Sequence, residues 1–510
     1  SQEIPFDSDR KRMLTLHALP ETLLENPALR TATNGAAPYL VAVKGAPDVV
    51  LGLCSAYLTK DGSVHPLDEE ARQRIAQAND AMTREALRML GFAYRMAGEP
   101  PEAEHLVDLE QDLIFAGLMG MIDPPRPEVR TAMEHARAAG IRTLMITGDY
   151  PNTARAIAES IGLLRKGHRV LTGAELNALD DAALRKEVEQ ADVYARVSPE
   201  HKVRIVDALK NNNEVVAMTG DGVNDAPSLK RSDIGIAMGI TGTDVTKETA
   251  DMILTDDNYA SIVSAVEQGR VIYSNIRKFV YFLISSNIAE ILVIFLASLG
   301  GLPTPLVPIQ LLWLNLLTDG APALALAMEK GEPDIMNRPP RPKKEPIING
   351  PIRTGIVIQG IAQTAAVLGA FVLGLTWHLS SQVPAGTSPF LYLFQYDWRG
   401  VDVQTAETMA FVTLSLCELF RAYTVRSERS SLFTIGVFSN RWMQYAAGAS
   451  VVLLIAVCVV PFLQPVFNTH LLAGREWLVA VGFALIPAVI EEIYKAILRS
   501  SDRRHQPAEA

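Results

Sequence analysis

The second half of the chain contains six long apolar stretches, whereas the first half alternates short apolar runs with polar segments. A bilayer core is about 30 Å thick, and about 20 apolar helical residues cross it. One such stretch could be a buried core helix, but six in succession predict an all-α transmembrane domain over residues 266–510. The predicted spans are 279–300, 306–328, 354–377, 406–424, 442–463 and 477–498.

Positive charges between the predicted spans alternate from one connection to the next. They are concentrated after the second, fourth and sixth spans and nearly absent after the first, third and fifth. The fourth span, for example, is followed by Arg421, Arg426, Arg429 and Arg441. Because positively charged loops remain in the cytoplasm, the pattern predicts a multi-pass protein of the cell membrane or an internal membrane. Its charged head and its C-terminus are expected to be cytoplasmic.

Residues 113–265 alternate strand-like runs with helix-like segments. This alternation predicts a parallel α/β sheet that binds ligands at the carboxyl ends of its strands. The predicted strands are Leu113–Ile122, Arg142–Ile146 and Val215–Met218, and the helices between them include Pro127–Ala139, Asn152–Ile161 and Glu200–Lys210. Each strand ends in a polar cluster: MIDPPRPEV (121–129), MITGD (145–149) or MTGDGVNDAP (218–227). A turn explains any one cluster, but three at one sheet edge indicate a site.

The polar clusters contain groups suited to a magnesium phosphate. Asp221, Asn224 and Asp225 return oxygen atoms towards one point, which suits Mg²⁺. A phosphoryl group would be held by Thr147, the backbone N–H groups of Gly148 and Asp149, and the mobile charge of Lys202.

Composition narrows the class of protein. The 510 residues are 48% hydrophobic and 20% charged, with a net charge of −10. The acidic balance argues against a general nucleic-acid binder. Three cysteines exclude a disulfide framework and favour a reducing compartment for the head.

Acidic and amide side chains lie inside three predicted spans: Asn287, Glu290, Asn315, Thr318, Asp319 and Glu418. A charge at the centre of a bilayer costs about 2.5–3.5 kcal/mol, so such groups are functional by default. Interhelical hydrogen bonds would explain Asn287 or Thr318 alone. Three carboxylates repel one another unless a cation or protons neutralise them. The all-oxygen set indicates a hard cation, and proton counter-transport is a hypothesis that follows.

Four motifs carry a resemblance to a known family. TGDGVNDAP, MITGD, DPPR (123–126) and KGAPD (44–48) resemble the P-type cation-transporting ATPases across essentially the whole chain. The resemblance implies a haloacid-dehalogenase-like phosphorylation domain over 109–265, with Asp221 on Mg²⁺, Thr147 and Lys202 at the transferred phosphoryl group, and Asn224 nearby. Residues 1–108 would form the C-terminal part of an α+β nucleotide-binding domain, in which Phe6 stacks on the adenine of ATP. The other implied nucleotide residues are Lys11, Lys44, Arg88, Asp123, Arg126 and Arg196.

The transmembrane motifs indicate which cation is carried. SSNIAE (285–290) and LLWLNLLTDG (311–320) resemble the sarcoplasmic-reticulum-type calcium pumps. That resemblance implies one Ca²⁺ site formed by Asn287, Glu290, Thr318, Asp319 and Glu418, and a second that uses Asn315 and Asp319. A pump for Mn²⁺ or for Na⁺ and K⁺ is an alternative. So are a non-catalytic fragment that binds nucleotide or cation and a membrane-anchored phosphatase.

The phosphorylated aspartate of the family lies in DKTGT, which does not occur in these 510 residues. We therefore expect the chain to be the C-terminal portion of a longer pump, whose N-terminal portion supplies DKTGT, the actuator domain and four further spans. On this expectation the phosphorylation domain lacks its nucleophile strand, and the isolated chain has no ATP turnover.

Overall fold

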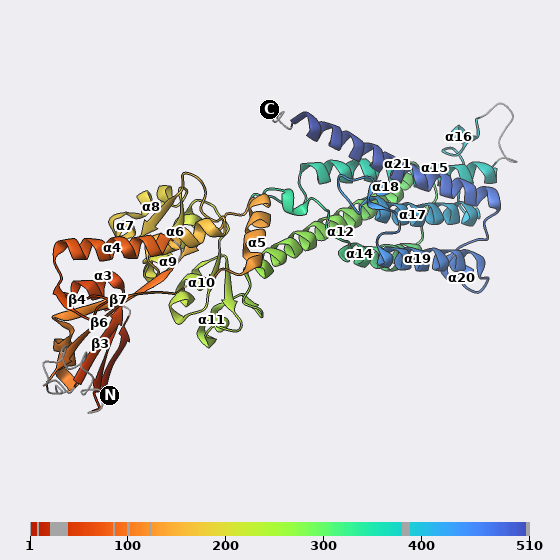
Figure 1. Ribbon diagram of the computed structural model, residues 1–510. Helices are drawn as coiled ribbons and strands as arrows, with labels where there is room; N and C mark the ends of the chain where they lie inside the picture. The colour runs from red at the N-terminus through yellow and green to blue at the C-terminus, as the bar shows by residue number, and fades with distance from the viewer. Residues whose placement is uncertain are drawn as a thin grey trace. The chain divides into compact units, whose positions relative to one another are not determined.

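The computed structural model describes residues 2–7, 10–20, 39–84, 87–98, 103–121, 124–379 and 388–505. Two compact units divide the chain, Ser1–Val263 and Ser264–Ala510. The first is the α/β head, and the second is a bundle of long helices (Figure 1).

A mixed seven-stranded sheet forms the N-terminal part of the head, with the strand order β1-β2-β3-β6-β7-β4-β5. Alternate side chains of its strands, such as Leu14 and Leu16 or Val41 and Val43, are buried in one core. Helices α3 (Pro47–Gly52) and α4 (Glu69–Arg84) pack against this sheet (Figure 1). The strands are β1 Gln2–Asp7, β2 Arg12–Ala18, β3 Tyr39–Gly45, β4 Cys54–Leu58, β5 Val64–Pro66, β6 Arg88–Ala97 and β7 Leu113–Met121.

The first strand of the predicted parallel sheet belongs instead to this N-terminal sheet. β7 pairs antiparallel with β6, from Arg88 opposite Met121 to Tyr94 opposite Ile114, and parallel with β4. The expectation that 113–122 joins the parallel sheet is therefore wrong. An apolar run predicts a strand, but its pairing depends on which partner the connection brings alongside.

The remaining head strands form two parallel three-stranded sheets, β8-β10-β9 and β11-β12-β13. β10 is buried along its whole length, as expected for a central strand covered on both faces. The first sheet consists of β8 Met145–Ile146, β9 Arg169–Thr172 and β10 Ala191–Ala195, and the second of β11 Ala217–Gly220, β12 Ile234–Met238 and β13 Met252–Leu254.

Helices alternate with these strands, as the sequence predicts. Three of them begin at a proline, Pro127, Pro151 or Pro199, which suits the first helical turn because its missing N–H would have no partner there. The helices are α5 Pro127–Ala138, α6 Pro151–Ser160, α7 Gly173–Ala178, α8 Asp181–Glu187, α9 Pro199–Asn211, α10 Ala226–Arg231 and α11 Asp244–Thr249.

Among the described residues, five helical segments are long and apolar enough to cross a membrane. They are α12 Tyr259–Leu299, the broken helix Pro308–Ala327, α15 Gly350–Leu379, α19 Arg441–Val459 and the part Gly474–Ser500 of α21 (Gly474–His505). The predicted span 406–424 corresponds to α17 (Gln404–Thr424), which also carries Glu407, Glu418 and Arg421. Nearly all of α17 is buried, and it packs against α15 and α21. The count of six spans therefore stays a prediction.

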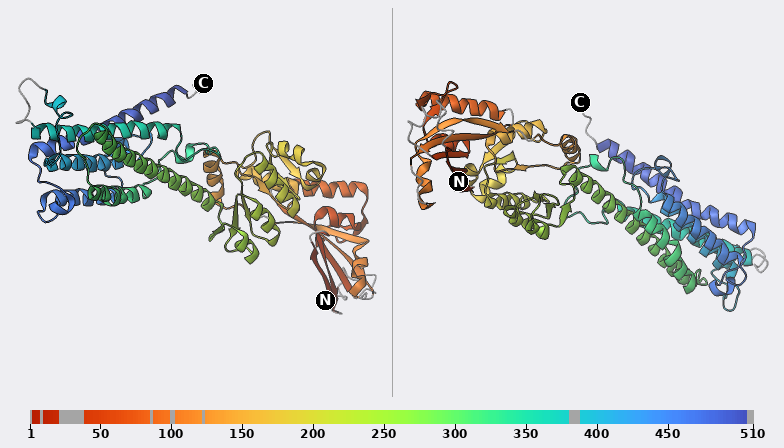
Figure 2. Two further views of the ribbon diagram at one scale, coloured as in Figure 1. Left: turned by 180° about the vertical axis from the view of Figure 1, so that it is seen from behind. Right: turned by 60° about the horizontal axis from the view of Figure 1, so that its bottom comes forward.

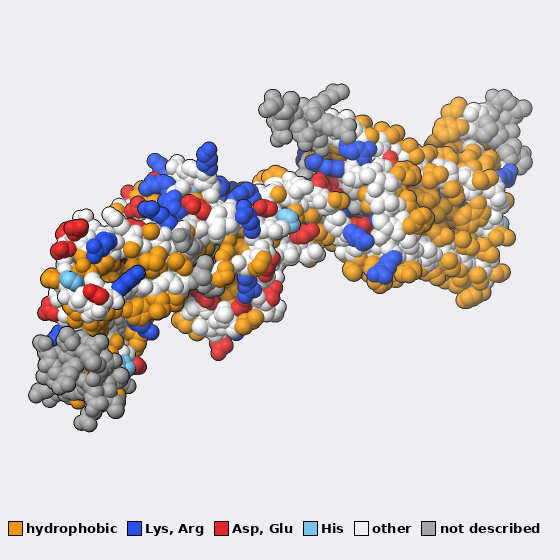
Figure 3. Space-filling model, in the orientation of Figure 1, with side chains coloured by type: hydrophobic (Ala, Val, Ile, Leu, Met, Phe, Trp, Pro, Cys, Tyr) orange, Lys and Arg blue, Asp and Glu red, His pale blue; other side chains and the backbone are white. Residues whose placement is uncertain are grey.

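The outward faces of the bundle are apolar, as lipid contact requires. Figure 3 shows hydrophobic side chains over much of the visible surface of this unit, and Figure 2 gives two further views of its helices. The large exposed side chains include Ile291, Phe295, Leu299, Leu324, Val452, Leu478 and Val489.

The second predicted span is not one regular helix. α13 (Pro308–Trp313) passes into a π-helical turn, Leu314–Thr318, before α14 (Gly320–Ala327) begins. The N–H of Asp319 donates to the carbonyl of Leu314 at 2.9 Å, five residues back. Pro322 accounts for the break, because a proline has no N–H to donate to the carbonyl of Thr318 and its ring collides with that group.

Candidate cation and nucleotide sites

Three carboxylates from three helices converge inside the bundle. Glu290 of α12, Asp319 at the start of α14 and Glu418 of α17 each place an oxygen within 4.8 Å of the others. All three are buried, Glu418 completely and Asp319 with 1% exposure. The structure thus brings together the three residues that the sequence singled out as mutually repelling.

These carboxylates lack the partners that a buried charge needs. In the described part of the chain, neither oxygen of Asp319 or Glu418 has a hydrogen-bond partner, and Glu290 Oε1 has none. Burying an ionised carboxylate without a partner is strongly unfavourable. Carboxylate oxygens are the ligands that hard divalent cations prefer, so the donor set fits such an ion.

The amide and hydroxyl side chains predicted for this site differ in their contacts with the carboxylate cluster. Asn315 donates from Nδ2 to Glu290 Oε2 at 3.0 Å, which joins it to the cluster, although much of its surface is exposed. Asn287 donates to the carbonyl of Leu283 on its own helix at 2.8 Å. Thr318 is buried in the π-helical turn. In a regular helix, residues 315, 318 and 319 would share one face, and the π-helical turn changes that spacing.

The prediction that counts Arg421 among the charges of the loop after the fourth span is wrong. The structure places it inside α17, fully buried, with Nη1 3.2 Å from Glu491 Oε2 of α21. Arg426 of the same count is also buried. The predicted end of that span, residue 424, coincides with the end of α17, so the span itself already contained Arg421.

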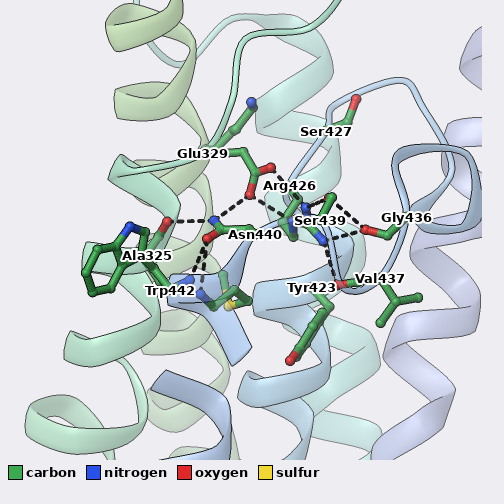
Figure 4. Close-up of polar contacts among 12 residues, drawn as sticks. Ala325, Glu329, Tyr423, Arg426, Ser427, Gly436, Val437, Ser439, Asn440 and Trp442 are labelled. Carbon is green, nitrogen blue, oxygen red and sulfur yellow. Dashed lines mark hydrogen bonds and ion pairs between the residues drawn. The ribbon is translucent and has the colours of Figure 1, made fainter. Parts of the chain in front are cut away.

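Arg426 is the main hydrogen-bond donor of a polar network at the end of α14 (Figure 4). Its guanidinium donates to both oxygens of Glu329, at 2.8 and 3.0 Å, and to the carbonyls of Gly436 and Val437, both at 3.0 Å. Asn440 donates to Glu329 Oε2 at 2.8 Å and to the carbonyl of Ala325 at 3.0 Å. The network therefore anchors the far end of the helix that begins at Asp319.

In the head, the buried Asp225 forms an ion pair with the half-buried Lys202. The second oxygen of Asp225 accepts hydrogen bonds from the N–H groups of Asp221 and Gly222, at 3.3 and 3.2 Å. A Cβ on Gly220 would lie 2.3 Å from the Cβ of Asp225, so this turn requires glycine. Asp221 and Asn224 are exposed, which leaves their side-chain oxygens accessible to a ligand.

Lys202 is positioned by the start of α9. His201 accepts from the N–H of Ser198 at 3.0 Å, and its other ring nitrogen lies 2.8 Å from Asn177 Oδ1. Burial and then the charge of Arg204 lower the pKa of His201. The neutral ring thus caps the helix, one residue before Lys202.

Thr147 follows β8 as predicted. Its hydroxyl accepts from the N–H of Asp149 and donates to the Asp149 carboxylate, both at 3.1 Å. Ile146, the residue before it, packs against the core cluster that contains Met218 of β11. The ends of β8 and β11 therefore approach each other, which brings the TGD and TGDGVND segments to one side of the head.

A cleft of about 320 Å³ lies between the N-terminal sheet and the β8 and β10 ends. Six predicted nucleotide residues line it: Phe6, Lys11, Arg88, Gly148, Asp149 and Arg196. Arg88 Nε lies 3.7 Å from Asp149, and Arg196 lies 3.9 Å from Asp48. Phe6 is 62% exposed, which a stacking aromatic would be and a core aromatic would not.

Two other predicted nucleotide residues, Lys44 and Arg126, are not among the residues that line this cleft. Lys44 lines a separate groove on the face of the N-terminal sheet, with Met13 and Phe92. Arg126 donates to the carbonyl of Asp256 at 3.1 Å, and Asp123 lies outside the described residues.

Sequence reasoning missed two side chains that line the cleft, Tyr150 and Asp48. Burial, together with Asp80 and Asp48, raises the pKa of Tyr150. Asp48 is the last residue of the KGAPD motif, and Tyr150 directly follows MITGD, so these two motifs were the available signal.

Two known protein families match parts of this chain. The family described as "P-type ATPase, cytoplasmic domain N" matches residues 1–128, and "Cation transporting ATPase, C-terminus" matches residues 303–497. The chain belongs to the P-type cation-transporting ATPases.

Within that family, several similar proteins are named as calcium-transporting members. Calcium-transporting ATPase 1 of Bacillus cereus is 42% identical over 97% of the chain and 53% of its own length. The calcium-transporting ATPase of Bacillus subtilis is 41% identical, over 96% and 51%. The endoplasmic reticulum-type calcium-transporting ATPase 4 of Arabidopsis thaliana is 35% identical, over 99% and 51%. The chain thus spans about half the length of these relatives.

Proposed function

We propose that this chain supplies the cation-binding and nucleotide-binding parts of an ATP-driven pump that exports Ca²⁺ from the cytoplasm. The observation that carries the proposal is the cluster of Glu290, Asp319 and Glu418, buried and without a cationic partner among the described residues. The names of the similar proteins support calcium as the ion.

The cation would be held by these carboxylates, by Asn315 and by further oxygens such as those of Asn287 and Thr318. Ca²⁺ accepts six to eight oxygen ligands in flexible geometry, which suits a site assembled from three helices and a π-helical turn. When the ion leaves, three carboxylates in a low-dielectric interior require neutralisation. Protons would serve, so we extend the proposal to proton counter-transport.

The head would bind ATP in the cleft, with the adenine on Phe6 and the phosphates directed towards Arg88, Gly148 and Arg196. Lys202, oriented by Asp225, and Thr147 would contact the transferred phosphoryl group. Mg²⁺ bound at the exposed carboxylate of Asp221 would neutralise charge on the phosphate oxygens. Asn224 lies in the same turn as Asp221. We expect the head to be cytoplasmic, where ATP is available.

The two parallel sheets favour a missing strand between them. In the described residues, β8 and β11 each pair on one side only, and Ala217 and Thr219 of β11 are exposed. A strand that ends in DKTGT would pair with both edges and place its aspartate between Thr147 and Asp221. We therefore expect no acid-stable phosphorylation of the isolated chain from γ-labelled ATP. Labelling of this chain would contradict that expectation.

Equilibrium binding of ⁴⁵Ca²⁺ to the purified chain in detergent tests the cation site. Glu290→Gln should abolish saturable binding, because it removes a negative charge from the cluster. Glu407→Gln is the matched control, since Glu407 is another buried carboxylate but accepts its hydrogen bond from Asn468. Unchanged binding by Glu290→Gln would overturn the proposal.

The same assay separates the alternative cations. If Mn²⁺ or Na⁺ displaces ⁴⁵Ca²⁺ at a lower concentration than unlabelled Ca²⁺ does, the result would favour a pump for that ion. When the chain is joined to a segment carrying DKTGT in sealed vesicles, ATP should drive Ca²⁺ uptake. Nucleotide and Ca²⁺ binding without uptake would favour a non-catalytic binding role.

A further inference from the structure

Arg421 is another buried charged residue of the bundle, and it follows Glu418 of the carboxylate cluster by three residues. Its side chain is 1% exposed, and its Nε donates to Ser285 Oγ of α12 at 2.9 Å. Its Nη1 lies 3.2 Å from Glu491 Oε2, and its guanidinium lies 4.3 Å from the ring centroid of Tyr281. Arg421 therefore joins α17 to α12 and α21.

The carboxylate of Glu491 is held from two further directions. Tyr281 of α12 donates to it at 3.2 Å, and Gln359 of α15 donates to Oε2 at 2.8 Å. Ion pairs of this kind are costly to bury and costly to break on one side. The four helices α12, α15, α17 and α21 thus meet at one junction, in which the charges of Arg421 and Glu491 cancel.

The junction lies next to the carboxylate cluster along two helices. Arg421 follows Glu418 by three residues on α17, a rise of about 4.5 Å on neighbouring positions of one helix face. Ser285 precedes Glu290 by five residues on α12, a rise of about 7.5 Å. The hydrogen bond between Arg421 and Ser285 therefore fixes the relative position of the two helices that carry Glu290 and Glu418.

Arg421 also has unused donors. In the part of the chain that the structure describes, neither Nη1 nor Nη2 makes a well-aligned hydrogen bond. Glu491 is the carboxylate within ion-pair distance of Arg421. An arginine released from Glu491 would be within side-chain reach of the unpartnered oxygens of Glu418.

We propose that Arg421 and Glu491 form a neutral clamp that positions Glu290 and Glu418 for the cation, and that Glu491 keeps the arginine from occupying the site. Arg421 is a positioning residue, acting through the helices it joins. This proposal rests on the proposed function, since the cation is the Ca²⁺ of that proposal.

The clamp predicts an asymmetry between its two halves. Glu491→Gln leaves an unpaired arginine one turn from Glu418, and the arginine should then compete with Ca²⁺. We expect the Kd for ⁴⁵Ca²⁺ to rise by about tenfold or more, since desolvated charges interact strongly. Arg421→Gln loses the positioning contact but leaves Glu491 with the hydrogen bonds from Tyr281 and Gln359 and no free cation beside Glu418, so the Kd should rise by only about threefold. The double variant Arg421→Gln/Glu491→Gln removes both charges and should recover most of the affinity lost in Glu491→Gln.

A control pair separates positioning from general stability. Arg426 and Glu329 form another fully buried ion pair of the same unit (Figure 4). Glu329→Gln should lower the thermal midpoint as Glu491→Gln does, but it should raise the Ca²⁺ Kd far less, because the arginine that it leaves unpaired, Arg426, lies at the far end of α14 from Asp319. Equal Kd changes in Glu329→Gln and Glu491→Gln, or a double variant as weak as Glu491→Gln, would overturn the clamp.

A readout without Ca²⁺ keeps the clamp testable if the proposed function fails. Dicyclohexylcarbodiimide modifies carboxyl groups in apolar surroundings, and the modified residue is identified by mass spectrometry of peptides. In Glu491→Gln the released Arg421 should protect Glu418, and in the double variant the modification should return. Wild-type protein that binds no Ca²⁺ would reject the proposed function. Unaltered modification of Glu418 in Glu491→Gln would reject the clamp.

Discussion

At the scale of single residues, the buried carboxylates show a conflict between stability and function. Asp319 has no hydrogen-bond partner for either oxygen among the described residues, and two other carboxylates lie within 4.8 Å. Such an arrangement destabilises the metal-free bundle and stabilises the bound cation. The sequence predicted the three residues because charges inside spans are rare. It did not predict their separations, which depend on how α12, α14 and α17 pack.

Asp319→Asn should therefore separate the two effects. We expect the metal-free bundle to become more stable, because one of three repelling charges is removed without loss of volume. Calcium-dependent stabilisation, about 2.7 kcal/mol at 100 times Kd, should disappear. Tryptophan fluorescence during thermal unfolding reports on this unit, since all five tryptophans lie between residues 313 and 477. A lower midpoint for the metal-free variant, with Glu407→Gln unchanged, would contradict the argument.

Asp192 of β10 is a buried head residue whose ionisation affects stability. Its carboxylate is fully buried and accepts from the backbone N–H and the Nε of Arg165, both at 3.0 Å. Burial alone would raise the pKa of Asp192, but the hydrogen bonds and charge of Arg165, with His168, lower it. The stabilisation is therefore present above the ordinary aspartate pKa, about 3.9. It is lost as the pH falls through the lowered value.

Asp192→Asn should destabilise the head by about 2 kcal/mol at neutral pH. That is less than for a fully buried pair, because Arg165 is partly exposed. The variant should also lose less stability than the wild type as the pH falls below 4. Pulse proteolysis in urea measures both effects, with the exposed Asp181→Asn as the control. Parallel pH profiles for Asp192→Asn and wild type would contradict the prediction.

At the scale of elements, the broken helix Pro308–Ala327 is where the structure departs most usefully from the sequence pattern. The apolar run predicted one span, and the structure inserts a π-helical turn beside Asn315 and Thr318. Turns of this kind often mark functional positions. Pro322 and Gly320 were visible in the sequence, and a proline inside a helical pattern is the signal that would have predicted the irregularity.

Pro322→Ala should let the helix continue regularly, because residue 322 gains an N–H for the carbonyl of Thr318. The helix should gain stability, since proline is about 3 kcal/mol less favourable than alanine in a helix interior. Asn315 would rotate relative to Glu290, so Ca²⁺ binding should weaken by about tenfold, or 1.4 kcal/mol. Pro308→Ala, in the first turn of α13, is the control and should change neither property. A Pro322→Ala variant with unchanged Kd would show that the π-helical turn does not position the site.

At the scale of the whole molecule, the head consists of three separate sheets where the sequence pattern favoured one parallel sheet from residue 113 onward. Parallel sheets are usually continuous and covered, so the one-sided pairing of β8 and β11 is the main irregularity of the fold.

Addition of a segment carrying DKTGT should slow amide hydrogen exchange at Met145–Ile146 and Ala217–Gly220, because a strand inserted there would accept and donate ladder hydrogen bonds. Exchange at β13 (Met252–Leu254), on the opposite edge of its sheet, should stay unchanged and provides the internal control. Protection at β13 without protection at β11 would contradict insertion between the sheets.

The sequence by itself determined which residues are apolar, which are charged, and where strands, helices and turn motifs fall. These features depend on local chemistry and periodicity, so the membrane segments, the TGDGVND turn and the residues Glu290, Asp319 and Glu418 were accessible. Only the tertiary structure decided that β7 pairs with β6, that Arg421 pairs with Glu491, and that Lys44 lines a different surface from Phe6. Those outcomes depend on contacts between segments distant in the chain, where packing and the pairing of buried charge outweigh local preference.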